Sequence, residues 1–344
     1  MNQAQWETLL RVVNGESLSN IPTGFIIDCP WLPGWFGIST IDYFSDNQCW
    51  FEANKKAIET FPETIFLPGF WAEYGMCTEP SAFGAKCQLF KDNMPHAEKV
   101  LGSLGEVDQL SKTNVKTDGL LPFVINRLKR TEPQIEGMGH QIKFAVARGP
   151  LNVASFLMGT TELMMGMMTE ADKCHKLVDL ITDFLIDWVG YQMECFPSIE
   201  GVLLLDDIVG FLGDEQCKEY VVPYFKKIYG SFDAKINMLH NDAAGLVSAP
   251  YLEQMGVNLF NPSFEHSLQE LKELTNNKVA ILGNIPPRDV LADGGPEDVK
   301  KSVKDCVEGV EDISRVMLSC GGGMPPNVDN ANIRAFIEAT RSVN

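Results

Sequence analysis

An imidazole and a carboxylate stand two residues apart at the end of the apolar segment KINMLHND (235–242). In a β-strand, side chains at positions i and i+2 leave the same face, with Cβ atoms roughly 6–7 Å apart. From there His240 and Asp242 can both bind one metal ion, at bond lengths of about 2.0–2.2 Å. Cys320, at the end of the last apolar run, can add a thiolate, and three protein ligands on zinc leave a catalytic position open. A His–Asp hydrogen bond without any metal remains the alternative interpretation.

Other apolar runs of the chain also end in polar side chains. Asp28, Asp206, Asn261 and Asn284 each close one of these runs. Because the carboxyl ends of parallel strands meet at one end of a barrel, we expect these residues to surround a common site. Asp206 is predicted to be a catalytic residue together with His240 and Asp242. The other three are predicted to contact the substrate, and Asp28 and Asp206 are also suited to orient the substrate or the groups around the metal.

The loop after the first apolar run, DCPWLPGWFG (28–37), carries three aromatic side chains among Pro and Gly. Trp31, Trp35 and Phe36 are suited to a loop that covers an apolar substrate. Ordinary packing of the loop against the body of the protein explains the same residues equally well, so both interpretations stay open.

Eight short runs rich in Val, Ile, Leu and Phe recur along the chain, as expected for strands that are covered on both faces. They cover residues 23–28, 64–69, 142–149, 201–207, 235–242, 257–262, 278–284 and 315–323. Amphipathic helical segments separate most of them, such as residues 175–192. The alternation predicts an α/β fold, a (β/α)8 TIM barrel formed as one domain over residues 1–344. We expect an N-terminal helix before it and an insertion around residues 70–141.

The composition excludes several classes of partner. The formal net charge of −18 at pH 7 argues against nucleic acid and against anionic membrane surfaces, since both attract clustered Lys and Arg. No apolar stretch approaches membrane-spanning length, and the N-terminus has the pattern of an amphipathic helix rather than of a signal peptide. Nine cysteines without a C-x-x-C pair favour a reduced, cytoplasmic setting.

Five segments together resemble the uroporphyrinogen decarboxylase superfamily over nearly the whole chain. They are ARGPLNVASFLMGTTELM (147–164), LLLDDIVGFLGDEQCKEYVVPYFKKI (203–228), LHNDAAGLVSAPYLEQMGVNLFNP (239–262), ILGNIPP (281–287) and PPNVDNANIRAFIEA (325–339). The resemblance independently implies a (β/α)8 barrel. It also implies one of two activities, because the superfamily contains true decarboxylases and zinc-dependent methyltransferases that exchange methyl groups with a corrinoid on a partner protein.

Residues 28–37 contain no arginine, and this favours the methyltransferase branch. The decarboxylases carry there an Arg-rich segment that grips the carboxylate arms of a tetrapyrrole. The methyltransferases show H-x-C after the fifth strand and a further Cys after the last one; His240 matches this pattern and Asp242 replaces the first Cys. The second Cys position falls nearer Gly322, two residues beyond Cys320. A carboxylate in place of a thiolate makes zinc harder and more Lewis-acidic.

We therefore expect methyl transfer between a small methylated substrate and a protein-bound corrinoid (methylcobalamin or cob(I)alamin), with zinc as Lewis acid. A methoxylated aromatic or a methylamine-like compound is the expected substrate. One alternative is a metal-free decarboxylase or lyase acting on a small carboxylic acid, in which a strand-end Asp and His240 handle protons. Another is a binding protein for a corrinoid or a methylated ligand. The sequence predicts neither the direction of transfer nor the oligomeric state.

Overall fold

The computed structural model describes residues 1–343, and each of the eight predicted runs coincides with one strand, with β9 extending one residue beyond its run. The strands are β1 (Gly24–Ile26), β2 (Ile65–Leu67), β5 (Phe144–Arg148), β6 (Gly201–Leu205), β7 (Ile236–Asn241), β8 (Leu259–Pro262), β9 (Ala280–Ile285) and β10 (Val316–Cys320). Every pairing among them is parallel. The prediction of an α/β fold with eight parallel strands is confirmed.

The strands follow one another around the barrel in chain order. β5 to β10 form a six-stranded sheet, and β1 pairs with β2. A parallel bridge between Thr23 and Leu318 joins β1 to β10, whereas no pairing joins β2 to β5 within residues 1–343. The strands therefore enclose a common interior, with one seam that is not hydrogen-bonded.

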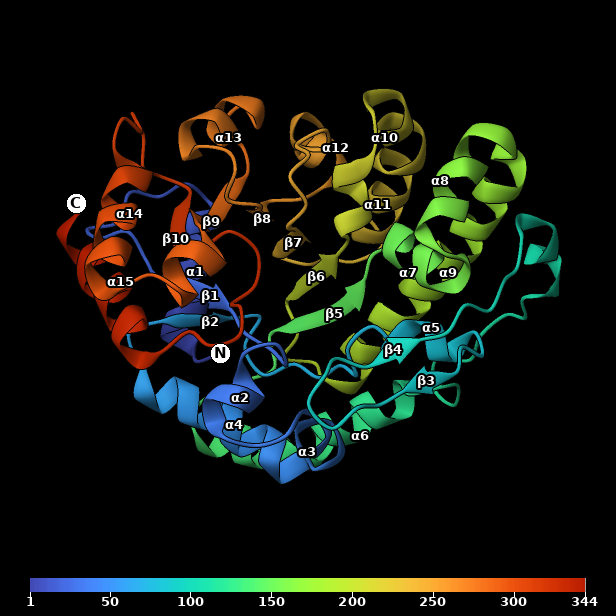
Figure 1. Ribbon diagram of the computed structural model, residues 1–344, viewed down its shortest axis with the longest axis horizontal. Coiled ribbons are helices and arrows are strands. Elements are labelled where there is room, and N and C mark those ends of the chain that lie inside the picture. Colours follow the sequence, from blue (N-terminus) through green and yellow to red (C-terminus); the bar gives the residue numbers. More distant parts are fainter. Residues whose placement is uncertain (344) are drawn as a thin grey trace.

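Helices lie outside the strands (Figure 1). They are α2 (Leu32–Phe36), α3 (Thr40–Ser45), α4 (Asn47–Thr60), α5 (Thr78–Ala82), α6 (Leu121–Gly137), α7 (Pro150–Met158), α8 (Thr160–Thr169), α9 (Ala171–Cys195), α10 (Asp214–Tyr220), α11 (Val222–Tyr229), α12 (Leu252–Met255), α13 (Leu268–Leu274), α14 (Pro296–Val307) and α15 (Asn330–Ser342). None of the helices described in residues 1–343 is long and apolar enough to cross a bilayer.

Successive side chains of each strand alternate between the barrel interior and the layer beneath the helices. On β6, Leu203 and Leu205 belong to the interior cluster of apolar side chains, whereas Val202 and Leu204 belong to the cluster that packs against the helices. This alternation decides which residue at the end of each strand faces the interior and which faces outward.

Helix α1 (Gln3–Val13) closes the amino-terminal end of the barrel. The side chain of Asn2 accepts a hydrogen bond from the Gln5 N–H, and the side chain of Gln5 accepts one from the Asn2 N–H, which fixes the start of the helix. Trp6 is almost fully buried and meets Phe144, at the start of β5, edge to face with 5.6 Å between ring centroids. An apolar helix face therefore fills this end, and the strand carboxyl ends are left for a site.

The segment 70–141, predicted as an insertion, is only partly regular. It contains α5, a short antiparallel hairpin of β3 (Cys87–Gln88) and β4 (His96–Ala97), a 3-10 turn (Leu104–Gln109) and α6. Met76 and Met94 of this segment line a cavity at the carboxyl ends of the strands. The segment thus supplies part of the wall of the candidate site.

Candidate active site

A cavity of about 470 Å³ lies at the carboxyl ends of the barrel strands. One part of its wall is polar and includes Asp28, Arg148, Asp207, His240 and Asp242. Another part is apolar, with Met76, Met94, Phe156 and Met324 among its side chains. Such a cavity, apolar with a few converging polar groups, is the usual form of a small-molecule site.

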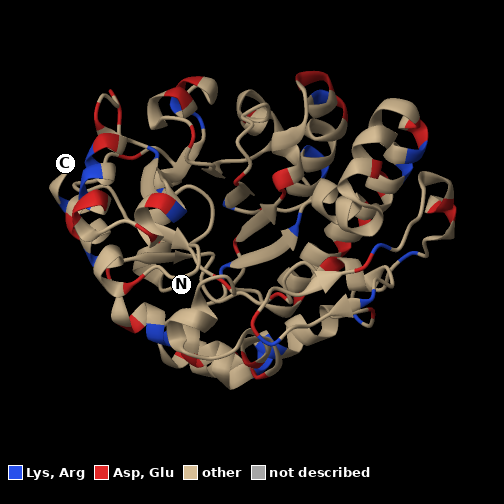
Figure 2. Ribbon diagram, viewed as in Figure 1, with Lys and Arg blue, Asp and Glu red and all other residues tan. Residues whose placement is uncertain are grey.

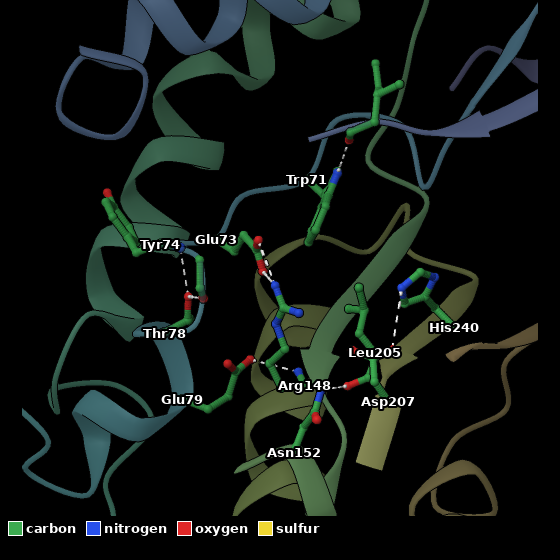
Figure 3. Close-up of polar contacts among 12 residues, drawn as sticks. Trp71, Glu73, Tyr74, Thr78, Glu79, Arg148, Asn152, Leu205, Asp207 and His240 are labelled. Atoms are coloured by element: carbon green, nitrogen blue, oxygen red, sulfur yellow. Dashed lines mark hydrogen bonds and ion pairs between the residues drawn. The ribbon is translucent and has the colours of Figure 1, made fainter. Parts of the chain in front are cut away.

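His240, Asp207 and Asp242 bring one ligand atom each to within 4.8 Å of one another. The His240 Nε2 lies 3.8 Å from the Asp207 Oδ1, a contact that Figure 3 marks with a dashed line. The backbone N–H of Asp242 donates a hydrogen bond of 3.2 Å to the same Asp207 oxygen. Burial raises the pKa of the Asp242 carboxyl, an effect that His240 opposes and the neighbouring Asp207 reinforces. Two carboxylates and an imidazole therefore converge, and the guanidinium of Arg148 lies close enough to oppose the rise in the pKa of Asp242.

Asn261 fixes the orientation of the His240 ring. Its side-chain N–H₂ donates to the carbonyl oxygen of Leu282 at 2.7 Å, so its Oδ1 is turned toward His240. That oxygen lies 2.7 Å from His240 Nδ1 and must accept a hydrogen bond from it. The proton is then on Nδ1, and the lone pair on Nε2 faces Asp207 and the cavity, as a metal ligand requires. Asn261, predicted to contact substrate, instead contacts the histidine.

The structure brings Asp207 to the site and turns Asp206 away from it. Asp207 continues the inward series of Leu203 and Leu205, because side chains two residues apart share a face. Asp206 is fully buried on the outer side, where its Oδ2 accepts a hydrogen bond of 2.9 Å from the backbone N–H of Leu151 at the start of α7. Burial raises the pKa of Asp206 to about 8. The predicted catalytic Asp206 thus holds a helix start, and its neighbour takes the position beside His240.

Cys320 likewise lies on the outer face of its strand. It belongs to the cluster that packs against the helices, its thiol points to the carbonyl oxygen of Gly322, and burial raises its pKa to about 12. It is not among the ligand atoms that converge with His240. Position 322 is different, since a Cβ added to Gly322 would lie 2.8 Å from the Cβ of Asp242. A side chain at 322 would reach the site, and one at 320 does not.

A buried group of charged side chains forms the wall next to these ligands (Figure 3). Arg148, at the end of β5, binds both carboxylate oxygens of Glu73 at 2.8 and 2.9 Å. The backbone N–H of Arg148 donates to Glu79, whose other oxygen is buried without a partner within residues 1–343. Burial raises the pKa of Glu79 to about 7 and that of Asp28, which lines the cavity, to about 8. Arg148 and Glu73 were not predicted from the sequence.

The remaining predicted substrate contacts lie away from the cavity. Trp31 is buried, its indole N–H donates to the carbonyl oxygen of Val328, and its ring stacks on Trp35 at 4.8 Å. Trp35 and Phe36 pack against the outer cluster. The side chain of Asn284 donates to backbone carbonyl oxygens of the loop after β8. Of the predicted aromatic loop, Asp28 and Pro30 line the cavity.

The profile of the uroporphyrinogen decarboxylase (URO-D) family matches residues 37–343. The chain belongs to this family. A methylated-thiol–coenzyme M methyltransferase of Methanosarcina mazei is 25% identical over 68% of the chain and 60% of its own length. The uroporphyrinogen decarboxylase of Pseudoalteromonas translucida is 22% identical over 76% of the chain and 75% of its length. The solved structure of a methyltransferase from Methanosarcina mazei covers 97% of both chains with a TM-score of 0.81 and 16% identity, which supports the URO-D family fold.

The three converging side chains of this URO-D family member fit a divalent cation. An imidazole nitrogen with a free lone pair and two carboxylate oxygens are all ligands that zinc accepts, and three protein ligands leave a further position for a substrate. The second carboxylate comes from Asp207 where the sequence predicted the thiolate of Cys320. Oxygen donors also make the ligand set harder than one with thiolates.

Charged side chains outside the candidate site lie mainly on the outer helices and loops (Figure 2).

Proposed function

We propose that this protein transfers a methyl group between a small methylated substrate and a protein-bound corrinoid, with zinc held by His240, Asp207 and Asp242. The observation that carries the proposal is the convergence of these three ligand atoms within 4.8 Å at the mouth of the barrel. Similarity to a methyltransferase that acts on methylated thiols supports the reaction class. The absence of arginine from residues 28–37 weighs against a tetrapyrrole that carries many carboxylates.

The side chains divide the work between binding and orientation. When bound, zinc supplies Lewis acidity to the atom that carries the methyl group. Asn261 keeps the lone pair of His240 Nε2 directed at the ion. Met76, Met94 and Phe156 hold the apolar body of the substrate and exclude water from it. With a carboxylate in place of each thiolate, the ion suits an oxygen or a nitrogen on the substrate, so a methoxylated aromatic or methylamine-like compound is the proposed partner.

A metal-free decarboxylase or lyase acting on a small carboxylic acid is the second candidate. The similarity to several uroporphyrinogen decarboxylases and the raised pKa values of Asp28 and Glu79 favour it, because both carboxyls can hold a proton near pH 7. The carboxylates in the wall oppose it. Arg148, the more deeply placed cation of the cavity, is already paired with Glu73, so an anionic substrate would rely on the exposed Arg288 and would be repelled by Asp207 and Asp242.

The methyl-transfer reaction can be tested with zinc-loaded protein, cob(I)alamin as acceptor and a panel of methyl ethers and methylamines, followed by the absorbance of methylcobalamin. We expect transfer by the wild type, background rates for His240→Ala, and wild-type rates for the control Cys320→Ala, whose side chain faces the outer layer. Carbon dioxide release from small acids by metal-free protein, without methyl transfer, would contradict the proposal and support the second candidate.

A further inference from the structure

Asp28 is a cavity-lining carboxyl group to which the metal site assigns no role. It follows β1 by two residues, and it shares its face with Ile26, whose side chain belongs to the barrel interior. Its carboxyl group lines the same cavity as His240 and Asp242. No hydrogen bond or ion pair engages this carboxyl group within residues 1–343, so it is directed at whatever occupies the cavity.

The neighbours of Asp28 do not supply a free positive charge. Glu73 and Asp242 are acidic, and both oxygens of Glu73 already bind Arg148. The two other titratable groups beside Asp28 are Cys29 and Tyr43, whose pKa values burial raises, so both stay neutral. Four acidic groups, Glu73, Glu79, Asp207 and Asp28, surround the single guanidinium of Arg148. Glu73 accepts two hydrogen bonds from its Nη2, and Asp207 is assigned to the metal, so the charges balance only when Asp28 and Glu79 are both neutral.

Methyl transfer from an ether oxygen is accelerated by a proton donor in addition to the Lewis acidity of zinc. When the C–O bond of a methyl ether breaks, its electron pair stays on the oxygen, and an alkoxide or phenolate is a poor leaving group. An acid that faces the cavity can protonate this oxygen as the bond breaks. Methylammonium donors differ, because their leaving amine is neutral and needs no proton.

We propose that Asp28 is the general acid that protonates the departing oxygen of a methyl ether in this cavity. The inference rests on the function proposed above. In the step, the methyl carbon bonds to the electron pair of the corrinoid acceptor, the C–O pair passes to oxygen, and the Asp28 proton moves to that oxygen. An alcohol or phenol and the Asp28 carboxylate result, and solvent returns the proton in the next cycle.

The proposal is tested by the dependence of the rate on the leaving group. Asp28→Asn keeps the size of the side chain and removes the transferable proton. We expect it to slow transfer from anisole-type ethers by about 10²- to 10⁴-fold, the usual contribution of a general acid. The defect should nearly vanish for 4-nitrophenyl methyl ether, whose phenolate leaves without a proton. The control Asp183→Asn makes the same substitution at an exposed acid of α9 that pairs with Lys227, away from the cavity, and should leave both rates unchanged.

Two further measurements do not depend on the variant reaction rates. The infrared difference spectrum of zinc-loaded wild type minus Asp28→Asn, without substrate, should show the C=O stretch of a neutral carboxylic acid at pH 6.5. The wild-type rate on anisole-type ethers should fall as the pH rises and Asp28 loses its proton.

Equal defects of Asp28→Asn on all leaving groups, or an infrared difference without a neutral carboxyl, would overturn the role of Asp28 and leave methyl transfer itself intact. A wild type that transfers no methyl group to cob(I)alamin from any donor would overturn the proposed function, and the role of Asp28 with it. The two failures are therefore distinguishable.

Discussion

The two ends of the barrel are built from the same eight strands and have opposite characters. At the amino-terminal end, α1 inserts Trp6, Leu9 and Val12 into the interior, and the contacts are almost entirely apolar. At the carboxyl end, the strand faces that carry leucine and methionine deeper in the barrel carry His240, Asp207 and Arg148. The difference shows that depth along a strand separates the residues that stabilise this fold from those that do chemistry.

Removing the Trp6 side chain from the amino-terminal end of the barrel should have the largest effect on stability and no effect on zinc binding. Trp6→Ala leaves a cavity against Phe144 and should lower the free energy of unfolding by about 3–5 kcal/mol. Urea denaturation measures this change. Zinc affinity, measured by competition with a chromophoric chelator at a temperature where the variant is folded, should equal that of the wild type. A large loss of zinc affinity in this variant would mean that the two ends are not independent.

Substitution of Asn261, at the carboxyl end of the barrel, should affect zinc affinity strongly and stability only weakly. Asn261→Ala removes the acceptor that places the proton on His240 Nδ1, so it should weaken zinc binding by about 10- to 100-fold. Its effect on stability should be smaller than that of Trp6→Ala. The same competition assay and urea denaturation report both quantities. Unchanged zinc affinity would show that the histidine is oriented by something else.

The buried acidic side chains near the candidate site should also make the stability of the protein depend on pH. Burial raises the pKa of Asp28 and Asp206 from 3.8 to about 8 and that of Glu79 from 4.5 to about 7. Between about pH 4 and pH 8 the folded protein then binds more protons at these groups than the unfolded chain, so their contribution to stability falls as the pH rises. Each group contributes at most about 1.4 kcal/mol per pH unit. Asp206→Asn should make the slope shallower in this window, and an unchanged slope would contradict the assignment.

The smallest effects are expected where the sequence suggested a role and the structure shows packing. Trp35→Ala lies outside the cavity and should change zinc affinity and substrate KM by less than about twofold, within the usual range for side chains that touch neither ligand. Isothermal titration and steady-state rates provide the comparison. A tenfold rise in KM would restore the aromatic loop to the substrate site.

The arrangement of strands and helices could be predicted from the sequence because hydrophobic periodicity and the alternation of elements reflect the fold directly. The position of His240 could be predicted because it closes an apolar run. The choice between Asp206 and Asp207 could not, because both faces of these strands are apolar and the pattern does not show which face is inside. The same ambiguity applies to Cys320.

Glu73 could not be assigned to the site from the sequence for a different reason. It lies in the weakly periodic segment 70–141, far along the chain from Arg148, and only the folded structure shows that they pair. Long-range partners of this kind leave no local pattern. A physical signal was present for Arg148, as a charged residue that closes an apolar strand, but a single sequence gives no partner for it.

The claim that His240, Asp207 and Asp242 hold zinc is most directly tested by the zinc content of protein purified without chelators. The content is compared between variants of two adjacent acids, Asp206 and Asp207. We expect about one zinc ion per chain in the wild type and in Asp206→Asn, and only a small fraction of that in Asp207→Asn, because the inward carboxylate alone is a ligand. Full zinc content in Asp207→Asn, together with its loss from Cys320→Ala, would contradict the account.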